Sequence, residues 1–520
     1  MTTIKTLADI TRVHAQNQGD DVALYYENDG RSWTYLELDQ EASRAAQALL
    51  AAGVGAQERI AYLDKNTPEY FVFLFGGAKI NAVSVAVNWR LAPPEMEYIL
   101  NHSEAKVLLV GEEFLPQLEV MNLDQIELVV VIGDPGESGY LSFEQWLSGH
   151  TADDPMYGVD ESDTCYQLYT SGTTGLPKGV ELTHANFLHC LDLSLEATGL
   201  ESKSVNLVCM PLFHISGSGW GVFGIFYGAR SVLLRDVDME MILRVIPEQG
   251  VTHSIFVPAV LQFLLASPNI GTIDFSSLQS IAYGASPITE AVLVEAMETF
   301  GCEFVQAYGL TETTGAITVL APEDHDPGGP RAHLLRSCGR PIEHHSLRII
   351  DAETGQDKAD GEVGEICVRG PQIMRGYWRN PEATKSSFTG EWFHTGDAGY
   401  LRDGYLYIHD RVKDMIISGG ENIYPAEIEN VLMQHPLVDD AAVIGVPSER
   451  WGETVKAIVT RHDETLSEQA VLEHCRKNLA GYKCPTSVDW MAEIPRNPSG
   501  KILKVELRKP YWVGRERQVS

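Results

Sequence analysis

Short apolar stretches alternate with helix-like segments along two long parts of this 520-residue chain. In residues 59–110 the apolar stretches are 60–63, 82–87 and 107–110, and the same alternation returns over residues 165–310. This alternation is typical of strand–helix–strand units, whose strands lie parallel in one sheet between layers of helices. At about 150 residues per domain, the length allows two to four domains. We therefore predict an α/β fold with two such regions.

The character of the sequence changes twice in its second half. From about residue 330, glycine-punctuated segments such as 361–370 predict a compact β-rich subdomain. Residues 412–520 hold 14 Lys and Arg against 16 Asp and Glu, whereas residues 1–411 carry the remaining net charge of -31. We therefore predict a large N-terminal domain over residues 1–411 and a smaller C-terminal domain over residues 412–520.

The charge and cysteine content exclude several classes of protein. A net charge of -33 repels phosphate backbones and anionic membranes, so we expect no nucleic-acid partner. We find no apolar run long enough to span a membrane and no signal peptide at the start. The eight cysteines contain no CxxC pair, which favours a reducing cytoplasm. Residues 496–517, with seven basic and two acidic side chains, are either a site for a polyanion or a solvated basic segment.

The most informative motif is YTSGTTGLPKGV, residues 169–180, which follows a strand candidate at 165–168. Its glycines allow backbone N–H groups to converge on phosphate oxygens, its hydroxyl groups add donors, and Lys178 adds a positive charge. The spacing is not that of a Walker P-loop, since a strand follows Lys178, and a helix should begin after Thr183 as N-cap. The alternative is an ordinary surface loop. The predicted phosphate-binding residues are Thr170, Ser171, Gly172, Thr173, Thr174, Gly175 and Lys178.

The motif resembles the signature of the adenylate-forming superfamily, which includes acyl-CoA synthetases, adenylation domains of peptide synthetases and beetle luciferases. Further landmarks of this family follow in the same order, at residues 283–287, 306–312, 392–397, 410–414, 419–429 and 495–501. The resemblance is effectively full length. It implies that the N-terminal domain holds two strand–helix–strand subdomains and a β-barrel-like subdomain, and that the C-terminal domain is a mobile α+β lid. A homodimer is a reasonable expectation for such an enzyme.

A carboxylate becomes a good acyl donor only when ATP converts its oxygen into a good leaving group. Its attack on the α-phosphate gives an acyl-adenylate and pyrophosphate, and the charge on the phosphate oxygens must be neutralised. By the resemblance, Lys501 is the catalytic lysine, Thr311 contacts the α-phosphate, and Glu312 with Thr170 binds Mg²⁺. The other ATP-binding residues that the resemblance implies are Gly284, Ala285, Gln306, Ala307, Tyr308 on adenine, Gly309, Asp397 on ribose, and Arg411.

The acyl acceptor is predicted from the same resemblance. Lys413 corresponds to the hinge about which the C-terminal domain turns, and the residues expected to contact CoA after the turn are Gly419, Gly420 and Glu421. No carrier module follows the small domain, which disfavours a multimodular synthetase. His214 stands where members that activate amino acids have an acidic residue, so we expect a carboxylic acid without a nearby amine.

The acyl pocket is expected between residues 214 and 260, where Gly217, Gly221, Gly224 and Gly228 recur on one face of a predicted helix. Glycine disfavours helices, so the space beside these residues is used either by a pocket or by close helix packing. His214 is either a catalytic residue that touches the carboxylate or a buried structural histidine. The predicted pocket residues are His214, Gly217, Ser218, Gly221, Gly284 and Gly309.

We predict an ATP- and Mg²⁺-dependent acyl-CoA ligase for an apolar acid, either a medium- or long-chain fatty acid or a ring-bearing acid. Its partners are then the small-molecule acid, ATP and CoA. The alternatives are an enzyme that loads a free-standing acyl carrier protein, a CoA ligase for aryl acids of the coumarate or benzoate type, and a non-catalytic module that binds a nucleotide or acyl-CoA.

Overall fold

The computed structural model describes residues 4–170, 176–193, 195–286, 288–352, 354–411, 414–418, 421–448, 451–479, 481–496 and 502–513. The chain divides into two compact units. The first unit comprises residues 1–335, 341–345 and 369–391, and the second comprises 336–340, 346–368 and 392–520. The boundary predicted after residue 411 lies inside the second unit and stays a prediction about which part of the chain moves.

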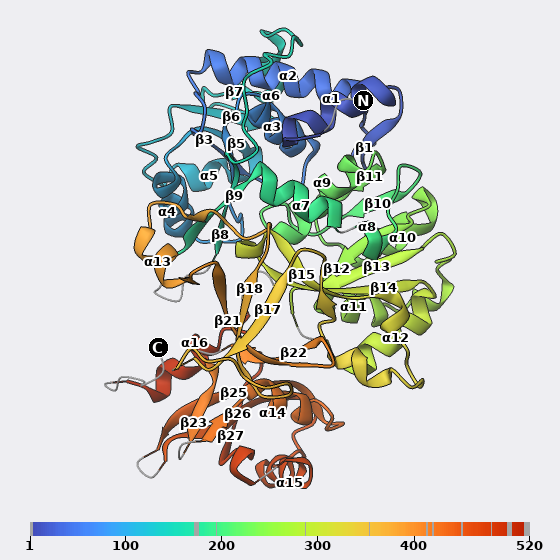
Figure 1. Ribbon diagram of the computed structural model, residues 1–520. Coiled ribbons are helices and arrows are strands. Elements are labelled where there is room, and N and C mark those ends of the chain that lie inside the picture. Colours follow the sequence, from blue (N-terminus) through green and yellow to red (C-terminus); the bar gives the residue numbers. More distant parts are fainter. Residues whose placement is uncertain are drawn as a thin grey trace. The chain divides into compact units, whose positions relative to one another are not determined.

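One sheet of the first unit has the strand order β19-β9-β8-β4-β3-β5-β6-β7. The strands from β8 to β7 along this order pair in parallel, whereas β9 and β19 add antiparallel neighbours. The strands are β3 (Arg59–Leu63), β4 (Val83–Ala86), β5 (Ala105–Gly111), β6 (Leu128–Ile132), β7 (Leu141–Ser142), β8 (Thr164–Thr170), β9 (Lys178–Thr183) and β19 (Gly376–Tyr377). The accompanying helices are α2 (Tyr35–Ala51), α3 (Pro68–Lys79), α4 (Pro93–Ser103), η1 (Glu112–Phe114), α5 (Leu115–Leu118), α6 (Phe143–Ser148) and α13 (Pro381–Ser386). Every residue of α3 is buried, so this helix lies inside a helical layer that also contains α1 (Leu7–Asn17) and α2 (Figure 1).

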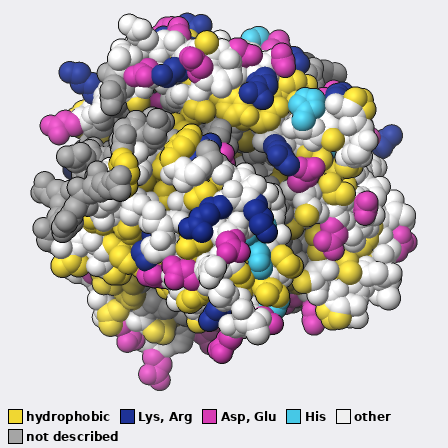
Figure 2. Space-filling view, turned by 90° about the horizontal axis from the view of Figure 1, so that it is seen from below, with side chains coloured by type: hydrophobic (Ala, Val, Ile, Leu, Met, Phe, Trp, Pro, Cys, Tyr) yellow, Lys and Arg dark blue, Asp and Glu magenta, His cyan; other side chains and the backbone are white. Residues whose placement is uncertain are grey.

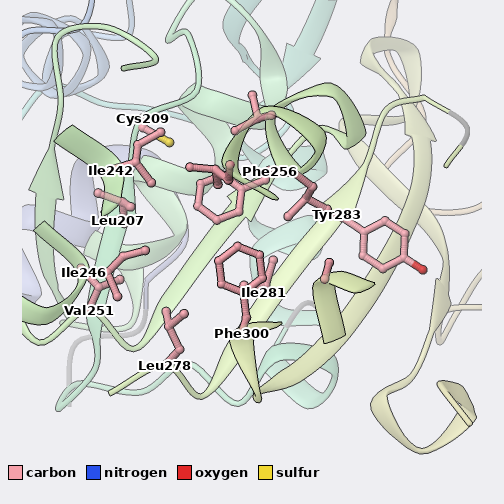
Figure 3. Close-up of a cluster of buried hydrophobic side chains, with 14 of the residues drawn as sticks. Leu207, Cys209, Ile242, Ile246, Val251, Phe256, Leu278, Ile281, Tyr283 and Phe300 are labelled. Atoms are coloured by element: carbon pink, nitrogen blue, oxygen red, sulfur yellow. The ribbon is translucent and has the colours of Figure 1, made fainter. Parts of the chain in front are cut away.

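The other sheet of the first unit runs in the order β15-β14-β13-β12-β10-β11-β1-β2. Its strands are β1 (Val22–Tyr26), β2 (Ser32–Thr34), β10 (Val205–Val208), β11 (Arg230–Leu233), β12 (His253–Phe256), β13 (Ser280–Gly284), β14 (Glu303–Leu310) and β15 (Gly315–Leu320). Its helices are α7 (His184–Leu193), α8 (Leu195–Thr198), α9 (Ile215–Phe226), α10 (Met239–Gln249), α11 (Pro258–Leu265), η2 (Ile270–Thr272), α12 (Glu290–Phe300), η3 (Thr311–Thr313), η4 (Pro322–Asp324) and η5 (Ala332–Arg336). Apolar side chains from strands and helices fill the space between them, among them Leu207, Phe256, Ile281 and Phe300 (Figure 3). The two predicted strand–helix–strand regions are therefore confirmed.

The second unit is built around antiparallel strands. Strand β21 (Trp392–Arg402) pairs with β18 (Gly364–Arg369) and with β22 (Tyr405–Arg411), as expected for a β-rich subdomain. The short strand β17 (Ser346–Ile350) also belongs to this unit. The short strand β20 (Phe388–Thr389) belongs to the first unit, and β16 (Arg340–Pro341) lies where the chain passes from one unit to the other.

The last part of the second unit is an α+β arrangement. A sheet of order β24-β23-β26-β25, with β27 beside β26, packs its apolar side chains against α14 and α15. Its elements are β23 (Ile416–Ser418), β24 (Glu421–Ile423), α14 (Pro425–Leu432), β25 (Val438–Ser448), β26 (Gly452–Arg461), α15 (Glu468–Asn478), η7 (Gly481–Lys483), β27 (Ser487–Trp490), α16 (Lys504–Arg508) and η8 (Lys509–Tyr511).

The surface mixes charges of both signs. On the face drawn in Figure 2, Lys and Arg side chains are interspersed with Asp and Glu and with hydrophobic side chains. In the described part of the chain, no helix combines the length and apolar character that crossing a membrane requires.

Candidate active site

The predicted phosphate-binding motif begins and ends on two paired strands. Thr170, the last residue of β8, lies directly opposite Lys178, the first residue of β9. The expected helix follows β9, because the Thr183 hydroxyl accepts a hydrogen bond from the Asn186 backbone N–H at 3.1 Å and so caps α7. The predictions for Ser171, Gly172, Thr173, Thr174 and Gly175 fall outside the described residues. The paired strands thus fix the two ends of the motif.

Glu312 brings residues from both sheets of the first unit together. It lies in η3, directly after β14, and its Oε1 accepts a hydrogen bond from the Thr170 hydroxyl at 3.4 Å. The same oxygen accepts a shorter hydrogen bond, of 3.0 Å, from the hydroxyl of Tyr377. The backbone is held as well, since Met374 N–H donates to the Glu312 carbonyl at 2.8 Å. The two residues predicted to bind a metal ion therefore contact each other.

Tyr377 is a site residue that sequence reasoning missed. It lies in the short strand β19, which pairs with β9 beside the phosphate-binding motif, and its side chain is buried. The Lys178 ammonium nitrogen lies 4.8 Å from the centre of the Tyr377 ring, within the range of a cation–π interaction. The Tyr377 side chain thus contacts both Glu312 and Lys178. The sequence signal was the glycine-aromatic run Gly376-Tyr377-Trp378, which by itself indicates only a strand.

Several residues predicted to bind ATP lie at the carboxyl ends of two neighbouring parallel strands, the usual position of a ligand in such sheets. Gly284 at the end of β13 lies opposite Ala307 of β14. A Cβ atom at Gly284 would lie 2.1 Å from the Ala307 carbonyl oxygen, and one at Gly309 would lie 1.7 Å from the Gly315 carbonyl oxygen. Both positions therefore require glycine because of neighbouring backbone.

Three further predicted residues lie at the same edge of the sheet. Ala285 adopts a φ of 65°, an uncommon conformation for a residue with a side chain. The Tyr308 side chain is buried. The buried amide oxygen of Gln306 has no hydrogen-bond partner among the described residues. A buried acceptor without a partner is costly, so this oxygen fits a donor from a ligand.

His214 is the N-cap of α9. Its Nδ1 accepts the Ser216 backbone N–H at 3.2 Å, and its carbonyl accepts the Ser218 hydroxyl at 3.1 Å. Burial lowers the pKa of His214 to about 4, so the ring is neutral at physiological pH.

The glycine-rich face of α9 is a packing surface, one of the two alternatives that the sequence left open. A Cβ atom at Gly217 would lie 2.2 Å from the Pro211 carbonyl oxygen, and one at Gly221 would lie 2.6 Å from the Phe71 ring. At Gly224 it would lie 2.4 Å from the Asn206 amide nitrogen. Gly228 lies beyond the end of the helix. The structure therefore supports the close-packing alternative over an acyl pocket against Gly217 and Gly221.

The remaining predicted residues belong to the second unit. Asp397 is buried in β21 and lies directly opposite Arg411 of β22, so the backbone brings the two predicted ribose-binding residues side by side. The Asp397 backbone N–H donates a hydrogen bond to the Thr395 hydroxyl at 3.1 Å, which holds the backbone of β21 between these two residues. Glu421 begins β24. The predictions for Lys413, Gly419, Gly420 and Lys501 fall outside the described residues.

Comparisons with known proteins show the family to which the chain belongs. Residues 11–378 match the family model "AMP-binding enzyme", and residues 427–501 match "AMP-binding enzyme C-terminal domain". The chain is 40% identical over 525 residues to the fatty acid–[acyl-carrier-protein] ligase ScoC of Streptomyces coeruleorubidus, with 99% of this chain and 98% of that protein covered. It is 36% identical over 479 residues to the long-chain-fatty-acid–CoA ligase FadD13 of Mycobacterium tuberculosis H37Rv, with coverages of 92% and 93%.

Among solved structures, the anthranilate CoA ligase AuaEII in complex with anthranoyl-AMP is similar over 97% of both chains, with a TM-score of 0.88 and 30% sequence identity. Fold, site and comparisons together define an adenylate-forming enzyme of the acid–thiol ligase class. The chain belongs to the AMP-binding enzyme family, and the predicted family and fold class are confirmed.

Proposed function

We propose that the protein activates an apolar carboxylic acid with ATP and transfers the acyl group to CoA. In the first step a carboxylate oxygen attacks the α-phosphorus, the bond to the β-phosphate breaks, and pyrophosphate leaves. In the second step the CoA thiolate, having lost its proton, attacks the acyl carbonyl and AMP leaves. The observation that carries this proposal is the contact of Glu312 with Thr170 and Tyr377, beside Lys178.

Glu312 and Thr170 fit Mg²⁺, because this ion prefers one or two carboxylates together with other oxygen ligands and water. We propose that these two residues hold it, where it would neutralise charge on the phosphate oxygens of ATP. The hydrogen bond from Tyr377 would then orient the carboxylate of Glu312. The Lys178 ammonium group lies over the Tyr377 ring and is therefore close to the proposed Mg²⁺ site, where it adds a positive charge for the phosphate groups of ATP.

The other roles rest on position in the fold and on the family resemblance. Gln306 offers its amide oxygen to the adenine amino group, and Tyr308 stacks on the ring. In the second unit, Asp397 accepts hydrogen bonds from the ribose hydroxyls, with Arg411 as a further donor. Lys501 supplies the positive charge for adenylation, Lys413 is the hinge, and CoA approaches along the segment Gly419-Gly420-Glu421.

His214 is proposed to act as a neutral group. With a pKa of about 4 it carries no charge at pH 7, so it can position a carboxylate by hydrogen bonding but cannot act as its counter-ion. We also propose that the enzyme acts in the cytoplasm, because its eight cysteines are all outside disulfides. A homodimer stays a prediction.

An acyl carrier protein is a second candidate acceptor, because the relative that is 40% identical to this chain is named as a ligase for that acceptor. The test is to measure pyrophosphate and AMP release over acids of graded chain length and several aryl and alicyclic acids. CoA and a phosphopantetheinylated carrier protein are offered in turn. AMP release that requires CoA supports the first proposal. Turnover with the carrier protein alone supports the second, and release of neither product overturns adenylation of the acids tested.

A further inference from the structure

A second group of chemically active side chains lies in the other unit of the protein. Glu365 and Cys367 are two residues apart in β18, so their side chains lie on the same face of the sheet. His394 in β21 lies directly opposite Cys367. The ligand atoms of these three side chains are all within 4.8 Å of one another. Among the residues that the structure describes, these three form the one group of His, Cys, Asp or Glu side chains whose ligand atoms lie close enough together to share a metal ion.

The spacing of these atoms resembles that of a tetrahedral metal site. The Cys367 sulfur lies 3.6 Å from Nδ1 of His394. Tetrahedral zinc, with bonds of about 2.3 Å to sulfur and about 2.05 Å to nitrogen, places these two atoms about 3.6 Å apart. Glu365 Oε2 lies 2.9 Å from the same nitrogen, somewhat closer than the roughly 3.4 Å of a bound pair. All three ligand atoms lie within 4.8 Å of one another, so a movement of the carboxylate would bring it into the third ligand position.

The kind of ligand selects the kind of ion. A thiolate, an imidazole and a carboxylate suit Zn²⁺ or Co²⁺, whereas Mg²⁺ prefers oxygen ligands alone. A divalent ion bound by one thiolate and one carboxylate gives a site without net charge. Cys367 is buried, whereas the side chains of His394 and Glu365 are 21% and 14% exposed, so an ion can enter from the solvent side.

The metal-free thiol holds its proton. Burial, together with the negative charge of Glu365, raises the pKa of Cys367 to about 12. The formation of a sulfur–metal bond would therefore release that proton to the solvent, as is usual when a thiol becomes a ligand.

We propose that Glu365, Cys367 and His394 bind one Zn²⁺ or Co²⁺ ion, with water as the fourth ligand. The bound ion links β18 to β21 only three residues before Asp397. Its three ligands belong to the second unit, whereas Glu312 and Thr170 belong to the first, and the proposal does not depend on the reaction proposed above.

The test uses the full-length protein, reduced with a phosphine and titrated with Co²⁺. One equivalent should give the visible bands of tetrahedral cobalt and a thiolate-to-cobalt charge-transfer band in the near ultraviolet, and Zn²⁺ should abolish both. The charge-transfer band should be lost in Cys367→Ser and retained in the control Cys338→Ser, which changes a partly buried cysteine of the same unit. A charge-transfer band that survives Cys367→Ser, or its absence from the wild type, overturns the proposal.

A second variant keeps the test decisive if Cys367→Ser does not fold. Glu365→Gln retains the shape of the side chain but removes its charge, so Co²⁺ affinity should fall about tenfold or more while the charge-transfer band remains. Zn²⁺ should also raise the melting temperature of the wild type more than that of Glu365→Gln, because a ligand that binds only the folded state stabilises it. Equal Co²⁺ affinity and equal Zn²⁺ stabilisation in the two proteins would show that Glu365, Cys367 and His394 do not form the site.

Discussion

The surroundings of Glu312 and the glycine face of α9 were both singled out by the sequence, yet only the first resembles a ligand site. Around Glu312, hydroxyl groups from two strands of one sheet, β8 and β19, converge on one carboxylate oxygen. Beside α9, the space freed by Gly221 and Gly224 is occupied by Phe71 and Asn206. A polar residue in a family motif thus predicts chemistry, whereas a row of glycines shows only that something approaches closely, whether ligand or protein.

The largest effect is expected for Glu312→Gln. Loss of the charge that the proposed Mg²⁺ ion requires should reduce acid-dependent pyrophosphate release by about 10²–10³-fold, the usual cost of removing one electrostatic contact to a transition state. Glu303→Gln is the matched control, because Glu303 is an exposed residue at the start of β14, the strand that leads directly to Glu312. Equal activity of the two variants would remove Glu312 from the active site.

Gly221→Ala tests whether the glycine face of α9 is a packing surface. Its new methyl group would meet the Phe71 ring at 2.6 Å, so the free energy of unfolding should fall by about 1–3 kcal/mol, measured by urea denaturation. Activity per folded molecule should stay unchanged if no acyl chain lies there.

Gly219→Ala is the control in the same helix, because its Cβ would lie 3.5 Å from Ile215, an ordinary contact. The additional change Phe71→Leu should restore part of the stability lost in Gly221→Ala. If the Gly221→Ala protein is stable but prefers acids of a different chain length, the acyl pocket does lie against the glycine-rich face of α9.

Tyr377→Phe separates the two contacts of that side chain. The ring under Lys178 remains, but the hydrogen bond to Glu312 is lost, and a bond to a charged group contributes about 1.5–3 kcal/mol. The Mg²⁺ concentration for half-maximal pyrophosphate release should therefore rise about tenfold. Tyr140→Phe, at an exposed tyrosine, should leave it unchanged. An unchanged Mg²⁺ requirement in Tyr377→Phe would mean that its hydroxyl does not orient Glu312.

The smallest effect concerns pH. Burial lowers the pKa of His214 from 6.5 to about 4, so the unfolded chain binds the extra proton more readily than the folded protein. The stability contribution of the neutral ring is complete above about pH 6.5 and is lost as the pH falls towards 4. His214→Asn should therefore show a flatter dependence of the urea midpoint on pH over this range. The same slope in both proteins would contradict the lowered pKa.

The sequence predicted the strand–helix rhythm, the N-cap at Thr183 and the proximity of Thr170 to Glu312, because each depends on local pattern or on a motif. It could not predict Tyr377, whose role depends on pairing between β19 and β9, almost two hundred residues apart in the chain. For the same reason the sequence, which has no CxxC pair, gave no sign that Cys367 and His394 meet across two strands. Residues that meet because distant strands pair have no characteristic spacing in the sequence, so the sequence alone does not predict their contact.

The pairing of Thr170 with Lys178 also bears on how this motif can change during evolution. Because side chains alternate between the two faces of a strand, the loss of one residue within β8 or β9 would turn every following side chain to the opposite face. An insertion between the strands costs little, since closing a longer loop adds only a small entropic penalty. Related sequences should therefore vary in length between the two anchor residues far more readily than within either strand.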